Sequence, residues 1–348
     1  MSDRPSPLPC PSVAAPGRRA WLRRTIHLAG AAAWLAATGG LTGCGREPPL
    51  RVAYHPWPGY APLELARHMG WWSNGPAIEA VRTASATQSV EQLRAGAVQA
   101  AALTLDEAIR VHAEGTPLVV VALFNQSVGA DVVMGGPLPS GGVWRRGLRV
   151  GHEAGMVGEL MAHTWLERVG LRYAEVTPVH ITPDEHETAW SRGDMDVLVT
   201  YEPVASRLRA RGVPVLFDSR ELPRERPILD VLAVRTDALD AHPRGLPALV
   251  RSLFDGQRHL HELPIDSAYR LAPWLGVARG DVAGTFRGLR LIDWAGQREW
   301  LAGPNPRLAT ATRGLATFMT TLNGGYGLPS VVASLPGPVT DFLPLEAP

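Results

Sequence analysis

The ten residues from 51 to 60 are Arg51-Val52-Ala53-Tyr54-His55-Pro56-Trp57-Pro58-Gly59-Tyr60, and they carry the strongest signal for the fold class of this 348-residue chain. The first four residues predict a short buried strand, and the proline-containing loop after them leads into a helix over 61–68 that stops near Gly70. The same order of strand, loop and helix recurs downstream. This rhythm is typical of parallel strands joined by crossover helices, so we predict an α/β fold.

The first part of the chain continues the pattern with clear helix-start signals. Ser85 caps a predicted helix that runs through Ala95, with Gln88 at capping-box spacing and Gly96 at the end. The further strands predicted here are 78–82, 99–103 and 118–124, another helix opens at Thr104, and residues 131–134 then leave this unit. The strand over 99–103 is apolar throughout most of its length, which predicts burial on both faces.

A second α/β unit follows the Pro/Gly-rich run 135–142, whose composition marks a boundary. Its predicted strands are 148–151, 176–181, 197–200 and 213–217, and its predicted helices are 156–169, 183–192 and 203–210. The apolar run 228–235 predicts a strand that returns to the first unit. Helical patterns over 246–263 and 307–322 dominate the remainder, and no internal repeat or heptad is visible.

These units predict a hinged clamp of two lobes, each a mostly parallel sheet flanked by helices. The two extended crossings lie near 131–135 and 227–231. The predicted organisation is 1–43 an export signal, 44–49 a tether, 50–133 plus 229–300 lobe 1, 134–228 lobe 2, and 301–348 a C-terminal helix and irregular tail packed on lobe 1. Ligands of such sheets bind at the carboxyl ends of the strands, so we expect the site between the lobes.

The N-terminal leader predicts export. Four arginines at 18, 19, 23 and 24 precede an apolar run over 26–41, which is too short for a comfortable membrane span. Leu41-Thr42-Gly43-Cys44 resembles a lipobox, so we expect cleavage before Cys44 and a lipid on its thiol; the alternative is an ordinary cleavage that leaves a free thiol. The run 18–23 resembles a twin-arginine signal, which leaves the twin-arginine and general secretory routes both open. The expected location is the periplasmic side of the cell envelope, anchored to a membrane.

Composition excludes several classes of function. Removal of residues 1–43 changes the net charge from +1 to −3, with 29 arginines against 32 acids, which argues against nucleic acid as a partner. Cys10 leaves with the leader, so disulfides and thiol catalysis are excluded. Lysine is absent, which excludes Schiff-base chemistry and a P-loop lysine. The eleven histidines form no metal-like cluster, since pairs such as His180 with His186 offer too few ligands, and we expect neither a metal nor a cofactor.

Several segments together resemble one family, the substrate-binding proteins of bacterial ABC importers for nitrate, sulfonates, taurine and thiamine-pyrimidine precursors. The resemblance spans about residues 50–320 and depends on the order and spacing of its segments. The segments that carry it are 51–60, Leu63–Trp72, Gly96–Ala108, Ser127–Asp131 and Gly193–Pro203. It implies a periplasmic-binding-protein type II fold and a lipoprotein that captures a small solute and delivers it to an ABC permease in the inner membrane.

The family's ligand contacts come from the loops at the strand ends, which implies a set of candidate ligand-binding residues here. They are Trp57, Tyr60, Ser85, Thr87, Thr104, Asp106, Ser127, Asp131, Gly155, Tyr201 and Glu202. Trp57 and Tyr60 either stack on a ligand or pack the lobe. Tyr201 and Glu202 end a buried strand and are expected to point at the cleft.

The other candidates open helices or lie near a crossing. Ser85 and Thr87 offer hydroxyls and amides to a polar head group or only cap the helix. Thr104 and Asp106 likewise face the cleft or complement the helix dipole. Ser127 and Asp131 touch the ligand or lock the hinge, and Gly155, with Met156, presents bare amides from lobe 2.

The acids Asp106, Asp131 and Glu202 influence the expected charge of the ligand. Buried carboxylates repel an anion unless arginine offsets them, so we favour a neutral or cationic organic ligand, such as a heterocycle. A sulfonate or nitrate is the alternative within the family.

Two other functions compete with transport. A lipoprotein of this kind can instead present its ligand to a membrane signalling receptor. A related fold serves a pyrimidine synthase, but this chain lacks the cysteine-rich iron motif of that enzyme. It also lacks a Gly-x-Ser-x-Gly elbow, so we expect no catalytic residue and no enzyme.

Overall fold

The computed structural model describes residues 47–136, 144, 146–322, 328 and 335–346. Glu47–Pro348 form one compact unit. The predicted export signal, the lipid site at Cys44 and most of the linker-like run 135–142 lie outside the described residues. None of the described helices is long and apolar enough to cross a membrane.

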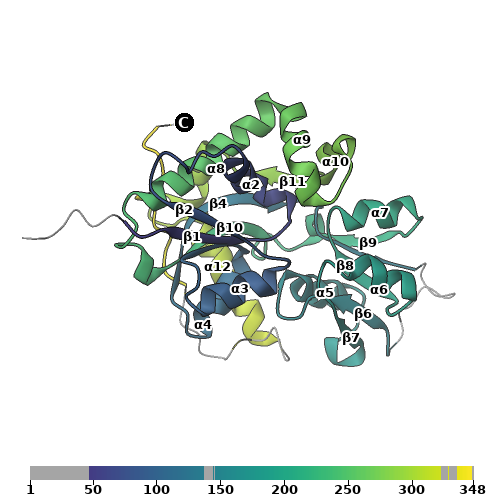
Figure 1. The fold of residues 1–348 in the computed structure, drawn as a ribbon. Coiled ribbons are helices and arrows are strands. Elements are labelled where there is room, and N and C mark those ends of the chain that lie inside the picture. The colour runs from purple at the N-terminus through teal and green to yellow at the C-terminus, as the bar shows by residue number, and fades with distance from the viewer. Residues whose placement is uncertain (1–46, 137–143, 145, 323–327, 329–334, 347–348) are drawn as a thin grey trace, which may run out of the picture. The chain divides into compact units, whose positions relative to one another are not determined.

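A six-stranded sheet is built mainly from the first part of the chain (Figure 1). Its strands, in spatial order, are β11 (Leu289–Leu291), β4 (Leu118–Ser127), β10 (Leu229–Arg235), β3 (Ala100–Thr104), β1 (Leu50–Tyr54) and β2 (Ile78–Arg82). Figure 1 shows α2 (Ala61–His68) and α8 (Gly245–Glu262) above this sheet, and α3 (Ala86–Arg94), α4 (Leu105–Ala113) and α12 (Arg307–Thr321) below it. Helices α9 (Pro264–Leu275), α10 (Val282–Thr285) and α11 (Trp294–Leu301) complete this half.

A five-stranded sheet is built from the middle of the chain. Its strands, in spatial order, are β7 (Thr177–His180), β6 (Arg149–His152), β8 (Val197–Thr200), β5 (Val132–Gly135) and β9 (Val215–Asp218). Leu160 of α5 (Val157–Arg168) packs with Val197 in one apolar cluster. Ala189 of α6 (His186–Arg192) and Leu208 of α7 (Val204–Ala210) pack in another.

Both sheets are mixed, because each contains a central strand that runs against its neighbours. Strands β1, β2 and β3 are parallel, as are β6, β7 and β8. Strand β10 is antiparallel to β3 and β4, and β5 is antiparallel to β8 and β9. These two strands follow the segments where the chain passes from one sheet to the other. The predicted α/β class of two helix-flanked sheets is confirmed.

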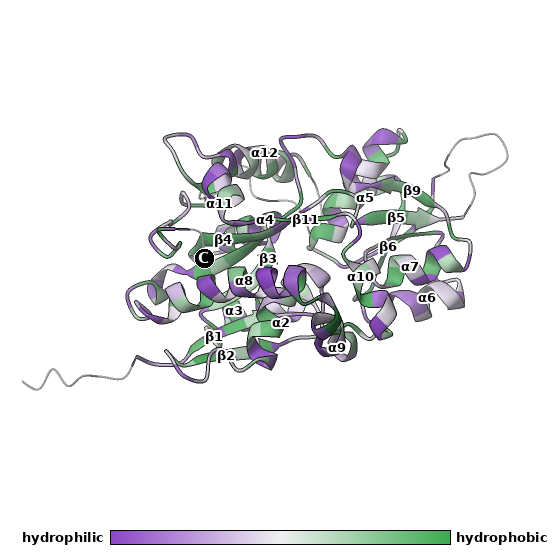
Figure 2. Ribbon diagram, turned by 90° about the horizontal axis from the view of Figure 1, so that it is seen from above, coloured by the Kyte–Doolittle hydropathy of each residue, from purple (hydrophilic) through white to green (hydrophobic). Residues whose placement is uncertain are grey.

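The core explains why these segments become strands. Leu103, Val120 and Val231 of the six-stranded sheet and Leu160 and Val199 of the other half belong to one buried apolar cluster. Figure 2 shows the same pattern, with hydrophobic strands inside and helices that carry hydrophilic residues outside. Burial of apolar area is the main favourable term in folding, so the β-rich apolar runs lie in the sheets.

The predicted elements match the structure most closely where the pattern is strongest. Helix 61–68 and strands 78–82 and 197–200 have the predicted bounds. The helix predicted from 183 begins at His186, because residues 182–185 form a turn with a hydrogen bond from Glu185 N to Thr182 O. Helices α9, α10 and α11 and strand β11 were not predicted. Helix α9 begins directly after α8, with Pro264 in its first turn, where a missing N–H costs nothing.

Candidate functional site

A small cavity lies where the strand ends of the two sheets meet. Its volume is about 20 Å³, which is room for about one water molecule. The lining residues are His55, Trp57, Tyr60, Ala86, Thr104, Glu107, Asp131, Glu153, Val157, Tyr201, Ile228 and Asp230. His55, Thr104, Glu153 and Tyr201 lie at or just beyond the carboxyl ends of β1, β3, β6 and β8, the position at which α/β sheets bind ligands.

One wall is an aromatic pair held by a buried acid. Trp57 Nε1 donates to Asp230 Oδ2 at 2.8 Å, and the Tyr60 hydroxyl donates to Asp230 Oδ1 at 2.8 Å. Both donors come from the loop after β1, whereas Asp230 lies on β10, opposite Thr104 of β3 in the strand register. The two hydrogen bonds fix both rings against the sheet.

Gly59 permits the tight loop between these rings. A Cβ atom at this position would lie 2.2 Å from Asn125 Nδ2 and 2.5 Å from Trp57 Nε1. Both distances are far below van der Waals contact. The loop can therefore hold Trp57 against Asp230 only with glycine at this position.

Four carboxyl groups surround the cavity: Glu107, Asp131, Glu153 and Asp230. Each is between 2 % and 7 % exposed, so water stabilises their charges poorly. Burial raises the pKa of Asp131 to about 7 and that of Asp230 to about 6, the latter despite the hydrogen bonds from Trp57 and Tyr60. Burial also raises the pKa of Glu107, with repulsion from Asp106, and the pKa of Glu153. None of the described lining residues is an arginine.

Two buried polar atoms in the cavity wall have no hydrogen-bond partner among the described residues. They are His55 Nδ1 and Asp131 Oδ2. Burial lowers the pKa of His55 to about 4, so this ring is neutral near pH 7 and adds no positive charge. Buried polar groups are normally paired, so unpaired atoms at a cavity are suited to a bound molecule.

Contacts across the cavity join the two halves. Glu153 Oε1 accepts from Thr87 N at 3.0 Å and from the Thr87 hydroxyl at 2.5 Å. Arg110 Nη1 donates to Gly155 O at 2.5 Å, and the ring of Tyr201 lies edge-on to Trp57 with centroids 4.8 Å apart. The structure therefore describes a closed state, in which the two halves are in contact.

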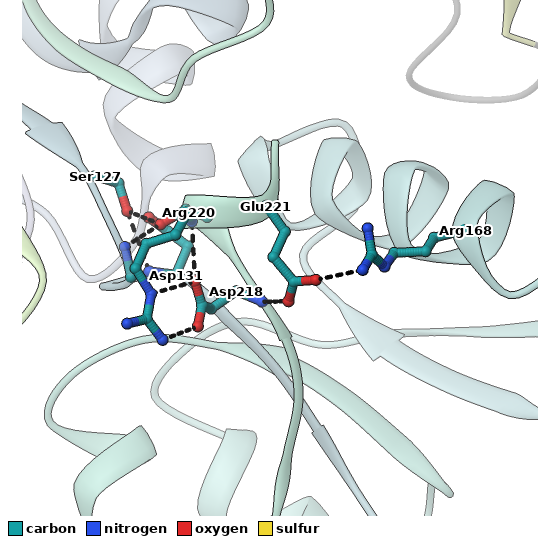
Figure 3. A network of polar contacts seen from close by, with 8 residues as sticks. Ser127, Asp131, Arg168, Asp218, Arg220 and Glu221 are labelled. Carbon is teal, nitrogen blue, oxygen red and sulfur yellow. Dashed lines mark hydrogen bonds and ion pairs between the residues drawn. The ribbon is translucent and has the colours of Figure 1, made fainter. Parts of the chain in front are cut away.

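The two segments that cross between the sheets are joined by hydrogen bonds (Figure 3). The hydroxyls of Ser127 and Ser219 are 2.7 Å apart, and Gly129 N donates to Ser219 Oγ at 2.6 Å. Asp131 N donates to Ser127 Oγ at 3.2 Å, and Ser219 N donates to Asp131 O at 3.0 Å. Ser127 therefore ties one crossing to the other, whereas the carboxyl group of Asp131 also lines the cavity.

The structure brings together five of the predicted site residues in the described cavity wall: Trp57, Tyr60, Thr104, Asp131 and Tyr201. Thr87 and Gly155 lie in contacts between the halves, and Ser127 lies between the crossings.

The other three candidates have different surroundings. Ser85 caps α3 by accepting from Gln88 N at 3.3 Å, and its side chain also interacts with Glu153 of the cavity wall. Asp106 is buried in the first turn of α4 and is not a lining residue. Glu202 accepts from Arg209 Nη1 at 2.7 Å and from Ser206 N at 3.0 Å. Its carboxylate therefore binds residues of helix α7.

Sequence reasoning missed several lining residues, including Glu107, Glu153 and Asp230. Asp230 interrupts an apolar run, which is a usable signal because an acid on a central strand needs partners. Glu107 was missed because its position in the first turn of α4 is typical of a capping residue. Its carboxylate does accept from Thr104 N at 2.9 Å. Glu153 follows β6 and gave no signal of its own. In the part of the chain that the structure describes, no group of three His, Cys, Asp or Glu could hold a metal ion.

The sequence and the fold are similar to those of known proteins. The model of the NMT1-like family matches residues 45–275. The alkanesulfonate-binding protein SsuA from Xanthomonas axonopodis pv. citri bound to MOPS is 18% identical, with a TM-score of 0.65 over 82% of this chain and 96% of that chain. The periplasmic nitrate-binding protein NrtA from Synechocystis PCC 6803 is 16% identical, with a TM-score of 0.62 over 81% of this chain and 82% of that chain.

A third similar structure is the periplasmic aliphatic sulphonate binding protein SsuA from Escherichia coli. It is 17% identical, with a TM-score of 0.61 over 78% of this chain and 90% of that chain. No curated protein matches the sequence. These likenesses confirm the periplasmic-binding-protein type II fold that the resemblance implied.

Proposed function

The chain belongs to the NMT1-like family, and from this premise we propose that it is the substrate-binding component of an ABC-type importer. It captures a small organic solute between its two halves and delivers it to a permease in the inner membrane. The observation that carries the proposal is the cavity at the strand ends of both sheets, walled by aromatic rings from each. We assign the chain no catalytic residue.

The size of the cavity requires movement. A volume of about 20 Å³ cannot hold an organic molecule, so a solute enters only when the halves separate. Separation breaks the contacts between Thr87 and Glu153 and between Arg110 and Gly155. Closure around the solute is favoured by the additional contacts it makes in the closed state.

A neutral or cationic solute suits this wall better than an anion. Four buried carboxyl groups face the cavity and no arginine is among the described lining residues, so an anion would meet repulsion without compensation. This distinguishes the proposed solute from the sulfonates and nitrate named for the similar structures.

The leader completes the proposal. Export followed by lipid attachment at Cys44 would hold the clamp at the periplasmic side of a membrane and raise its concentration near the permease. Labelling of cells with palmitate tests this step: wild type is expected to incorporate label and Cys44→Ala to lose it. Absence of label from wild type contradicts the lipid anchor.

The capture function is tested by native mass spectrometry of residues 44–348 purified from cells. We expect a small molecule to accompany the protein and to be lost in the Trp57→Ala variant. Trp71→Ala is the matched control, because Trp71 contacts His259 and does not line the cavity. Equal retention by both variants would exclude this cavity as the site, and absence of any bound solute or solute-induced closure would refute the function.

A further inference from the structure

We propose that the solute presents a protonated amine to the cavity and expels a proton from its carboxyl groups on binding, so that capture is coupled to pH. This inference rests on the proposed function and adds the chemical class of the solute. The observations that support it are the four acids of the cavity wall and the unpaired acceptor atoms in that wall.

The acids come from both halves and from a crossing, so closure places them around one point. Asp230 lies on β10, Glu107 in the first turn of α4, Glu153 just after β6 and Asp131 just before β5. Repulsion between like charges and loss of water both oppose ionisation of all four together. A cation enclosed by them removes this penalty, which an uncharged or anionic molecule cannot do.

The unpaired atoms indicate a donor rather than an acceptor. Asp131 Oδ2 accepts hydrogen bonds when ionised. His55 is neutral and its Nδ1 can also accept. An ammonium group has three N–H donors and no acceptor, so it matches this set. The rings of Trp57, Tyr60 and Tyr201 line the same cavity, and aromatic rings can attract a cation.

Nearby positive charges are engaged elsewhere. Arg110 donates to Gly155 O and pairs with Glu114, Arg220 pairs with Asp218, and Arg209 pairs with Glu202. The groups that act on the Asp131 carboxyl are acids or neutral: Asp230 of β10, Asp106 of α4, Ser127 of β4 and Tyr201 after β8. Glu107 of α4, Glu153 after β6 and the neutral His55 after β1 line the same cavity. The cavity lacks an internal counter-charge within its described wall.

The proton balance is simple. Without solute, a carboxyl group such as that of Asp131, with a pKa of about 7, is largely protonated below neutral pH. When the ammonium arrives, the carboxyl O–H bond breaks, the proton passes to water and buffer, and the carboxylate accepts an N–H from the solute. Below this pKa about one proton leaves for each cation bound, whereas above it the carboxylate is already ionised and binding releases none. Acid therefore favours release of the solute and neutral pH favours capture.

The test uses three probes of similar shape: benzylammonium, benzyl alcohol and benzenesulfonate. Titration calorimetry in two buffers of different ionisation enthalpy measures both affinity and proton release. We expect benzylammonium to bind best, to release about one proton, and to gain affinity about tenfold per pH unit between pH 5 and 6.5 before levelling above about pH 7.5. Tighter binding of benzenesulfonate, or an affinity for benzylammonium that is independent of pH, overturns the inference.

Variants separate a charge effect from general damage. Asp131→Asn keeps the shape of the side chain and removes its titration, so proton release and the pH dependence are expected to fall. Asp240→Asn is the control, because Asp240 is exposed and lies outside the wall. Unchanged proton release in Asp131→Asn contradicts the role of Asp131.

The outcome also separates this inference from the function on which it rests. If the protein retains an anionic or permanently uncharged solute from cells, the amine is excluded and solute capture stands. If it retains no solute and binds none of the probes, both proposals are refuted.

Discussion

The two halves of the molecule contribute to the cavity in different ways. The half with the six-stranded sheet provides a wall whose parts are bonded to one another, since Trp57 and Tyr60 both donate to Asp230. The half with the five-stranded sheet provides Glu153, Val157 and Tyr201, whose partners across the cavity belong to the other half. The first wall can persist when the halves separate, whereas the second is completed only by closure. The comparison indicates a preformed receptor face and a covering face.

The largest expected effect concerns Asp131, at the crossing between these faces. Its pKa is raised in the folded protein, so its contribution to stability is complete below the unfolded value near 4 and is lost as pH rises through about 7. The stability of wild type relative to Asp131→Asn should therefore fall by about 4 kcal/mol between pH 4 and 8. Urea unfolding of both proteins between about pH 4 and 8 measures this change. A difference in the free energy of unfolding that does not vary with pH would contradict a raised pKa for Asp131.

Trp57→Ala should damage the preformed face next. Removal of a buried ring and of one donor to Asp230 is expected to lower the free energy of unfolding by about 3 kcal/mol. The half-buried Trp71 provides the control, since Trp71→Ala leaves both hydrogen bonds to Asp230 in place. The urea midpoints of the two variants are compared. An equal loss of stability in both would mean that the hydrogen bond from Trp57 to Asp230 adds nothing to the stability of the fold.

Tyr201→Ala should affect the covering face instead. Tyr201 contacts Trp57 across the cavity, so its removal is expected to weaken solute binding about tenfold, or about 1.4 kcal/mol, with a smaller change in stability. The comparison of titration calorimetry with urea unfolding separates the two effects. A loss of stability as large as that of Trp57→Ala would show that both faces are equally integral to the fold.

Thr87→Val should give the smallest change. It removes the hydroxyl that donates to Glu153 and leaves the Thr87 amide in place, so the closed state should lose about 1 kcal/mol. Small-angle scattering of the solute-free protein is expected to show a larger radius of gyration, whereas the exposed Thr188→Val should show none. An unchanged radius would mean that this contact does not hold the halves together.

Local signals predicted much of the fold. Ser85 with Gln88 gave the start of α3, and the loop from His55 to Tyr60 gave the strand and helix on either side of it. Helix α9 was missed because it follows α8 without a polar linker, so one helical pattern runs into the next. The alternation with helices predicted parallel strands, but not the antiparallel course of β5 and β10, because an apolar run fits a parallel or an antiparallel neighbour equally well.

The site was predicted less completely, for a similar reason. Trp57, Tyr60 and Tyr201 were predicted because aromatics at strand ends are conspicuous, and they line the cavity. Asp106 and Glu107 are neighbours, and only the rotation of α4 decides which of them lines the cavity. Glu202 was expected at the cleft, but Arg209, seven residues later on α7, holds its carboxylate.

The sequence by itself determined the α/β class, the order of most strands and helices, and the aromatic residues at the strand ends, because these depend on local patterns of apolar and capping residues. Only the tertiary structure decided which acids lie together at the cavity. Asp131, Asp230, Glu107 and Glu153 are separated by up to 123 positions, and two antiparallel return strands and the closure of two halves bring them to one cavity. Their raised pKa values come from that shared burial, which no single segment contains.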